Sequence, residues 1–202
     1  SGRSARPDPA SLPAAIDAQL ATKRGSGPVD VAFYGGSFTA IPVDDQRAYL
    51  ETVQPFIDAG TVTAIRVSTR PDGISDGILA LLRRYRVSTV ELGIQSLDDD
   101  VLRRSGRGHT ARQTRDAFAL LRQNSYRIGL QIMCGLPGDS AETFRRTVRE
   151  VIGLGPDFVR IYPTLVLAGT PLEALYRSGE YAPLALEDAV TQCRDAVAAF
   201  RE

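Results

Sequence analysis

Five short stretches rich in β-branched and aromatic residues alternate with helix-like segments, and this alternation limits the possible folds more than any other feature. The stretches begin about thirty residues apart and read VDVAFYGG, VTAIRVST, TVELGIQS, RIGLQIMCG and DFVRIYPTLVLAG. A repeated strand and helix is typical of βαβ units around a parallel sheet. Because the stretches are almost continuously apolar, we also expect strands that are covered on both faces.

The helix-like segments carry their own start and stop signals. Three residue pairs have the spacing of a capping box: Asp139 with Glu142, Thr110 with Gln113, and Thr170 with Glu173. Gly60, Gly155 and Gly179 stand where helices are expected to stop. A further helix is expected over about residues 12–23, with no strand-like stretch before it.

The length of the chain decides between a complete and a partial barrel. A full eightfold (β/α) barrel needs about 250 residues, whereas this chain has 202 residues and five visible βα units. We therefore predict an α/β fold, a parallel (β/α) partial barrel of TIM-like type, as one domain over residues 1–202. Since the first helix has no strand before it, we expect that the first strand lies upstream of Ser1 and that the chain is truncated there.

Composition indicates an ordinary globular protein of a reducing compartment. The chain has no apolar run near the ~20 residues that span a bilayer, and it begins with no secretory signal. Cys134 and Cys193 are too far apart in sequence for a CxxC motif and too few for a disulfide framework. We expect a cytoplasmic protein with no membrane partner.

The polar residues that follow each strand-like stretch are the candidates for a ligand site, because ligands of parallel α/β folds bind at the carboxyl ends of the strands. Gly35 and Gly36 let a ligand approach bare backbone, and Ser37 and Thr39 add hydroxyls. The other stretches end with Ser68, Thr69, Arg70, Asp72, Gln95, Ser96, Gln131, Arg160 and Tyr162. Because buried amides and hydroxyls are costly without partners, the set predicts a polar ligand. The alternative is that these groups bond to one another and to loop backbone.

Other motifs exclude several enzyme classes. The single histidine, His109, either contacts a substrate or starts the helix that Thr110 caps, and its position favours the helix start. No nucleophile-elbow sequence accompanies it, so a Ser–His–Asp hydrolase is excluded. The segment GLPGDS lacks the Lys-Ser/Thr ending of a phosphate-binding P-loop.

Six motifs, in order between residues 29 and 175, resemble the radical S-adenosylmethionine (radical SAM) superfamily, and within it the branch of the Elongator catalytic subunit. They are FYGGSFT, STRPDGI, VELGIQS, RSGRGHT, GLQIMCGLPGD and FVRIYPTLVLAGTPL. The same motifs also resemble oxygen-independent coproporphyrinogen oxidases. The resemblance implies an enzyme core that binds SAM across its strand ends, where cleavage of SAM gives a 5′-deoxyadenosyl radical.

The resemblance places the amino-acid part of SAM on four residues. Gly35, Gly36 and Ser37 match the motif that holds the methionine ammonium, with Ser37 where the family usually has an acid. Arg107 matches the guanidinium that pairs with the SAM carboxylate, for which an arginine offers a bidentate fork.

It places the nucleoside part on four others. Ser68 matches a ribose position that is often acidic, and Gln131 matches a second ribose-contacting position. Gln95 resembles a glutamine that reaches the ribose or the methionine, and Tyr162 resembles the residue that borders the adenine.

The family's chemistry also needs a [4Fe-4S] cluster held by a CxxxCxxC motif, which these residues lack. No metal ligand and no catalytic residue is therefore assigned within the chain, which would be inactive by itself. We expect the cluster loop upstream of Ser1, because a degenerate protein would have been free to lose Gln95 and Arg107 as well. The alternative is a cluster-free, non-catalytic module that binds SAM or RNA.

The resemblance to the Elongator branch suggests transfer RNA (tRNA) as the substrate, with a reductant for the cluster as a second partner. The net charge is zero, from 24 basic and 24 acidic residues, so charge neither requires nor excludes a polyanion. Arginines gather in three groups: Arg83, Arg84 and Arg86; Arg103, Arg104 and Arg107; Arg145, Arg146 and Arg149. We expect most of them to be solvated and paired with nearby acids rather than bound to phosphates.

Overall fold

The structure of the protein is a computed structural model that describes residues 7–201. Its centre is a sheet of five parallel strands in the order β1-β2-β3-β4-β5. The strands are β1 (Asp30–Phe33), β2 (Ala64–Thr69), β3 (Val87–Gln95), β4 (Arg127–Cys134) and β5 (Phe158–Pro163). The predicted α/β fold with five parallel strands is confirmed.

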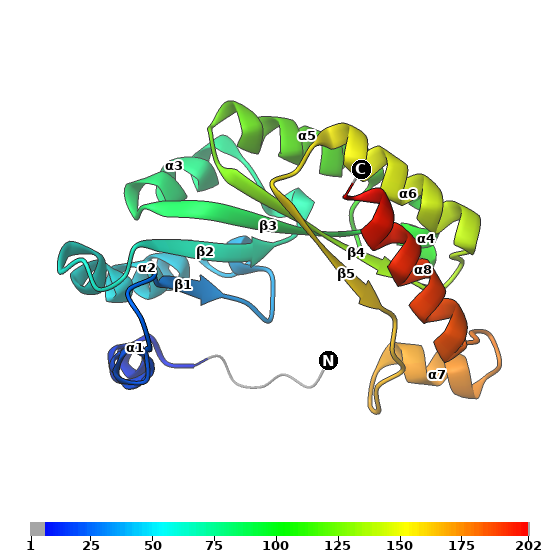
Figure 1. The fold of residues 1–202 in the computed structure, drawn as a ribbon, viewed down its shortest axis with the longest axis horizontal. Helices are drawn as coiled ribbons and strands as arrows, with labels where there is room; N and C mark the ends of the chain where they lie inside the picture. The colour runs from blue at the N-terminus through cyan, green and yellow to red at the C-terminus, as the bar shows by residue number, and fades with distance from the viewer. Residues whose placement is uncertain (1–6, 202) are drawn as a thin grey trace.

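Helices lie on the outer side of this sheet, which curls into a half-barrel with an open concave side (Figure 1). The helices of the described chain are α1 (Leu12–Ala21), α2 (Val43–Asp58), α3 (Asp76–Arg84), α4 (Asp99–Arg104), α5 (Ala111–Gln123), α6 (Ala141–Leu154), α7 (Pro171–Arg177) and α8 (Leu186–Ala199). Of these, α1 and α7 flank the two edges of the open side instead of covering the outer face (Figure 1). Short 3-10 turns stand at Pro9–Ser11, Phe38–Ala40 and Pro71–Gly73. Within residues 7–201, no helix is both long and apolar enough to cross a membrane.

The two faces of the sheet carry different side chains. Alternate positions on the inner strands hold aliphatic residues that are buried beneath the helices: Ile65, Val67, Val90, Leu92, Ile94, Ile128, Leu130 and Ile132. The positions between them carry pocket residues: Ser68, Glu91, Gly93, Gln131, Arg160 and Tyr162. The expectation that both faces are covered holds for β3, where Thr89 and Glu91 on the concave side are also buried, but the concave face of the sheet forms the wall of a pocket.

Two of the three predicted helix starts lie at the expected residue. Thr110 and Gln113 form a capping box at the start of α5. Thr170 caps α7 by accepting from the Glu173 N–H, but the Glu173 carboxylate accepts from the Gly169 N–H at 2.7 Å and so closes no reciprocal box.

The third start is displaced by one residue. Ser140 caps α6 and forms the box with Thr143, whereas the sequence predicted Asp139. The Asp139 carboxylate instead accepts from the Gly135 N–H at 3.0 Å and from the Ser140 N–H at 2.9 Å. Asp139 thus closes the loop between β4 and α6, and the next residue becomes the cap.

Candidate functional site

A pocket of about 630 Å³ opens on the concave side of the half-barrel, at the carboxyl ends of the strands. It is lined from the ends of all five strands and from the segment between α4 and α5. All eight residues placed by the resemblance line it: Gly35, Gly36, Ser37, Ser68, Gln95, Arg107, Gln131 and Tyr162. The structure therefore brings together the whole predicted set, which comes from segments up to 127 positions apart.

The turn after β1 leaves room for a ligand. Gly35 has a φ of +94°, a left-handed conformation that an L side chain rarely adopts. A Cβ atom built on Gly35 or Gly36 would meet no protein atom within 4 Å. Since no neighbouring side chain fills this space, the backbone of residues 35–37 is open to a ligand in the pocket.

Two other polar residues from the strand ends serve the fold instead of the pocket. The Thr39 hydroxyl is buried and lies 2.6 Å from the Thr69 hydroxyl, so it ties the turn after β1 to β2. The Ser96 hydroxyl accepts from the Asp98 N–H at 3.1 Å and lies 3.4 Å from the Thr147 hydroxyl. For these residues the alternative of bonding within the protein is the one observed.

A β-bulge aims Gln95 into the pocket. The register between β3 and β4 shifts between Gly93 and Gln95, and Gln95 has a φ of +63°, which is uncommon for a residue other than glycine. The Gln131 amide Nε2 donates to Gln95 Oε1 at 3.2 Å. A Cβ atom on Gly93 would lie 2.7 Å from Gln95 Nε2, so a larger residue there would push this amide out of its present position. Backbone strain of this kind is concentrated at functional sites.

Three arginines line the pocket, and two of them are paired with acids. Arg70 pairs with Asp72, with Nε 2.9 Å from Oδ1, and the Nε atom of Arg160 lies 3.1 Å from Glu91 Oε2. The third, Arg107, has no acidic partner among the described residues.

The Arg107 guanidinium is half-buried and lies against a sulfur atom. Its Nη2 atom lies 3.4 Å from the sulfur of Met133, and its buried Nε atom has no hydrogen-bond partner within residues 7–201. Burial lowers the pKa of the Arg107 guanidinium from its ordinary value. A partly desolvated charge without a counter-ion is costly, so an anion in the pocket would find an unpaired cation at Arg107.

Glu91 and Tyr34 are pocket residues that the sequence analysis did not single out. Glu91 is a buried acid in the middle of β3, and Tyr34 directly precedes Gly35. An acidic residue inside the apolar stretch TVELGIQS was the available signal, because burial obliges a carboxylate to find a partner.

His109 also lines the pocket, next to the helix start that Thr110 caps. Its Nε2 atom lies 3.1 Å from the Ile94 carbonyl oxygen, and its buried Nδ1 atom has no partner among the described residues. Because a carbonyl only accepts, the neutral ring carries its proton on Nε2. Burial lowers the pKa of His109, which favours this neutral form.

The residues present do not fit a [4Fe-4S] cluster. Cys134, at the end of β4, and Cys193, in α8, have their sulfurs 3.8 Å apart, and neither lines the pocket. Burial raises the pKa of the Cys134 thiol to about 12, which disfavours the thiolate that a metal needs. No group of three or more His, Cys, Asp or Glu residues that could hold a metal ion exists within residues 7–201.

Comparison with known protein families gives two matches. Residues 3–151 match the Radical SAM superfamily, and residues 156–202 match the Radical_SAM C-terminal domain. The boundary between the two matches falls just before β5.

Curated relatives are similar over most of this chain. The tRNA uridine(34) acetyltransferase of Methanocaldococcus jannaschii is 32% identical over 182 residues, which cover 80% of this chain and 34% of the relative. That of Methanocaldococcus infernus is 33% identical over 130 residues, or 63% and 24% of the two chains. Human Elongator complex protein 3 is 26% identical over 182 residues, which cover 80% of this chain and 33% of the human protein. The chain thus spans about a quarter to a third of these relatives.

Solved structures share the fold. Elp3 of Methanocaldococcus infernus with an N-terminal deletion superposes with a TM-score of 0.81 at 26% identity, covering 94% of this chain and 49% of that one. Coproporphyrinogen III oxidase of Escherichia coli, a radical SAM enzyme, gives a TM-score of 0.65 at 16% identity, covering 84% and 39%. At that identity the second likeness bears on the fold alone.

Proposed function

The chain belongs to the radical SAM superfamily, and from that premise we propose that its pocket binds one molecule of SAM in the orientation that Arg107 dictates. The supporting observation is the half-buried Arg107 guanidinium, which lines the pocket without an acidic partner in residues 7–201. In this arrangement the SAM carboxylate pairs with Arg107, and the ammonium lies at the open turn of residues 35–37. Gln95 and Gln131 then face the ribose with amide donors and acceptors.

The work of the described residues is to bind and orient this ligand. When bound, SAM supplies the 5′-deoxyadenosyl group from which the family draws its radical chemistry. The paired amides of Gln95 and Gln131 give the ribose hydroxyls a fixed set of partners, and the exposed Tyr162 ring gives the adenine an apolar surface. The described residues lack ligands for the cluster, so we propose that any [4Fe-4S] cluster is held by cysteines outside residues 1–202.

A non-catalytic SAM-binding module is the second candidate function. It is favoured by the absence of a metal-binding group within the described residues. Both candidates use the same pocket, so SAM binding does not separate them. A CxxxCxxC motif elsewhere in the encoded protein would support the enzyme.

We further propose that the substrate is tRNA. This rests on the curated relatives, whose name describes acetylation of tRNA uridine 34. Because this chain covers only part of their length, the proposal concerns the class of substrate and not the acetylation step.

The SAM proposal is tested by titrating the protein with SAM in a calorimeter. We expect Arg107→Ala to weaken SAM binding by tenfold or more, because a hydrogen bond to a charged partner contributes about 1.5–3 kcal/mol. Arg107→Lys should retain part of the affinity, since it keeps the charge but loses the bidentate fork.

Arg115→Ala is the matched control, because Arg115 pairs with Glu150 on the outer helices and does not line the pocket. Its SAM affinity should equal that of the wild type. An Arg107→Ala protein that binds SAM as tightly as the wild type would refute the assigned orientation.

A further inference from the structure

Glu91 occupies the middle of the concave face, where a carboxylate needs partners. Its side chain is 2% exposed although it lies in the pocket wall. Glu91 Oε2 receives two contacts, from the Nε atom of Arg160 at 3.1 Å and from the Tyr34 hydroxyl at 3.2 Å. A buried carboxylate with two such donors is held in one position.

These partners come from opposite edges of the sheet. Arg160 belongs to β5 and Tyr34 follows β1, and in the order β1-β2-β3-β4-β5 these are the two edge strands. The Arg160 Nη2 atom donates to the Tyr34 hydroxyl at 3.2 Å across a sequence separation of 126 residues. The Arg160 guanidinium carbon also lies 5.0 Å from the centre of the Tyr34 ring. The contacts therefore bridge the concave side from β1 to β5, with β3 between them.

The Tyr34 hydroxyl can donate one hydrogen bond and can also accept hydrogen bonds, and in this cluster it does both. It accepts from Arg160 and donates to Glu91. Burial, and after it the negative charge of Glu91, raises the pKa of Tyr34, so the phenol keeps the proton that it donates.

The cluster also fixes where a negative charge can bind. The charges of Glu91 and Arg160 cancel, as do those of Arg70 and Asp72. Arg107 is left as the pocket cation without an acidic partner in the described chain. Glu91 thus keeps Arg160 from competing with Arg107 for a carboxylate.

We propose that Glu91 is a positioning residue: through Arg160 and Tyr34 it fastens the end of β1 to β5 and so sets the position of the turn of residues 35–37. The proposal rests on the proposed function, in which that turn holds the SAM ammonium. Tyr34 is bonded directly to Gly35 through the chain, so a shift of its ring displaces the turn.

The test compares the SAM affinity of the wild type, Glu91→Gln, Tyr34→Phe and the control Glu150→Gln by calorimetry. Glu150 pairs with Arg115 on the outer helices, so its variant removes an acid from an ion pair far from the pocket lining. We expect Glu91→Gln and Tyr34→Phe each to weaken SAM binding by about tenfold, the loss of roughly one hydrogen bond to a charged group. Glu150→Gln should bind SAM as the wild type does.

Tyr34→Phe is the decisive variant, because it leaves the Glu91–Arg160 ion pair intact and removes only its link to β1. A purely stabilising ion pair would leave the SAM affinity of Tyr34→Phe unchanged, and that result would overturn the proposal. The proposal would also be overturned if Glu150→Gln weakened SAM binding as much as Glu91→Gln and Tyr34→Phe do. If Glu91→Gln does not fold, Tyr34→Phe still decides, since its hydroxyl is the only group removed. A wild-type protein that does not bind SAM would refute the proposed function itself, which is a separate outcome.

Discussion

His109 shows how a single residue in the pocket links structure to pH. Its Nε2 atom faces the Ile94 carbonyl and its Nδ1 atom is buried without a partner among residues 7–201, so the neutral ring suits the site better than the charged one. Burial is the main cause of its lowered pKa, and the bond to the Ile94 carbonyl and the nearby Asp72 only partly oppose it. In the unfolded chain the pKa of a histidine is about 6.5. Below that pH the unfolded state therefore binds more protons than the folded state.

This difference in proton binding predicts that His109 makes the protein less stable at acid pH. The free energy of unfolding should fall as the pH drops from about 7 through about 6.5 towards the folded-state pKa, because protonation favours the unfolded chain. In His109→Gln, whose amide can still donate to the Ile94 carbonyl, this part of the fall should disappear. Urea unfolding of the wild type and of His109→Gln between about pH 5 and 7.5 measures the free energy of unfolding of each protein.

Other groups, such as Asp139, titrate in both proteins, so the difference between the two pH profiles isolates His109. Parallel profiles would show that His109 does not titrate differently in the folded and unfolded states.

The strands and helices show which features a local sequence pattern predicts and which it does not. The positions of the strands were predicted from their apolar residues. The Thr110 cap was predicted from a side chain that bonds to the backbone three residues ahead. Both signals are local properties of the sequence. Gly60 and Gly155 take the left-handed conformation at helix ends, with φ of +72° and +68°. The bulge at Gln95 was not predicted, because a register shift depends on the neighbouring strand β4.

Gly129 in β4 and Gly153 in α6 allow the same substitution to be tested in two environments. A Cβ atom on Gly129 would overlap the ring of Phe158. The centre of that ring lies 5.2 Å from the central guanidinium carbon of Arg66 and 5.4 Å from that of Arg127. We expect Gly129→Ala to destabilise the protein by about 1–3 kcal/mol, since overpacking forces side chains to move.

Gly153→Ala is the control, because a Cβ atom there meets nothing within 4 Å. A helix favours alanine over glycine, so this variant should gain about 0.5–1 kcal/mol. Chemical denaturation of the two variants measures both changes, and equal effects would contradict the overlap at Gly129.

For the molecule as a whole, the sequence predicted the fold class and the eight pocket residues but not the bridge across the concave side. Strand ends of a parallel sheet meet at one edge, so their polar residues could be grouped in advance, whereas Arg107, between α4 and α5, was indicated only by the resemblance to the radical SAM family. The contact of Tyr34 with Arg160 depends instead on how far the sheet curls, which no local pattern states. The pairing of Arg160 with Glu91 depends on the same curvature.

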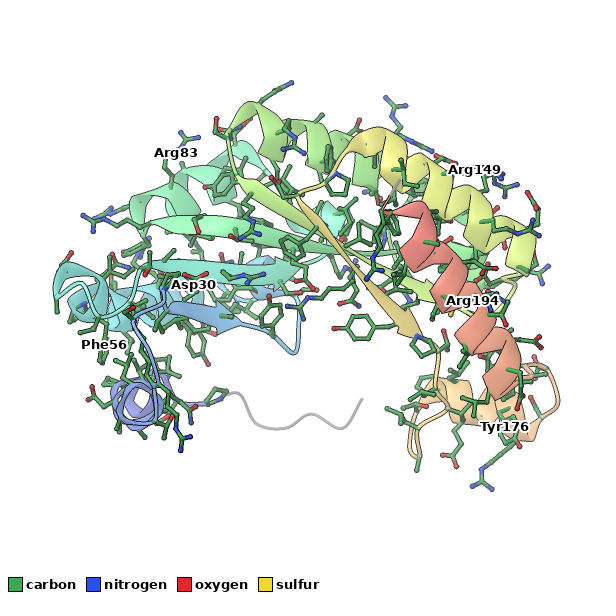
Figure 2. The ribbon with its side chains drawn as sticks, viewed as in Figure 1. Asp30, Phe56, Arg83, Arg149, Tyr176 and Arg194 are labelled. Atoms are coloured by element: carbon green, nitrogen blue, oxygen red, sulfur yellow. The ribbon has the colours of Figure 1, made fainter. Side chains whose placement is uncertain are left out.

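The arginine groups were predicted to be helix-face residues paired with acids, and the structure bears this out for most of them. Ion pairs join Arg103 and Arg104 to Asp100, Arg145 and Arg149 to Glu142, Arg146 to Asp98, and Arg86 to Asp58. Figure 2 shows Arg83 and Arg149 on the outer, helix-covered side of the sheet. Arg107, by contrast, is a pocket residue.

This arrangement predicts weak contact between these helices and RNA, with an affinity that depends only modestly on salt. Each phosphate contact adds about 0.7–0.9 to the slope of log affinity against log salt, and arginines already paired with acids have little charge to offer. We expect residues 1–202 to bind tRNA with a slope no steeper than about −2, measured by fluorescence anisotropy between roughly 50 and 200 mM salt. Asp100→Asn should steepen the slope, because it releases Arg103 and Arg104 together. A wild-type slope near −5 would mean that about six phosphates are held by unpaired charges, and the prediction that the acids neutralise these arginines would then be wrong.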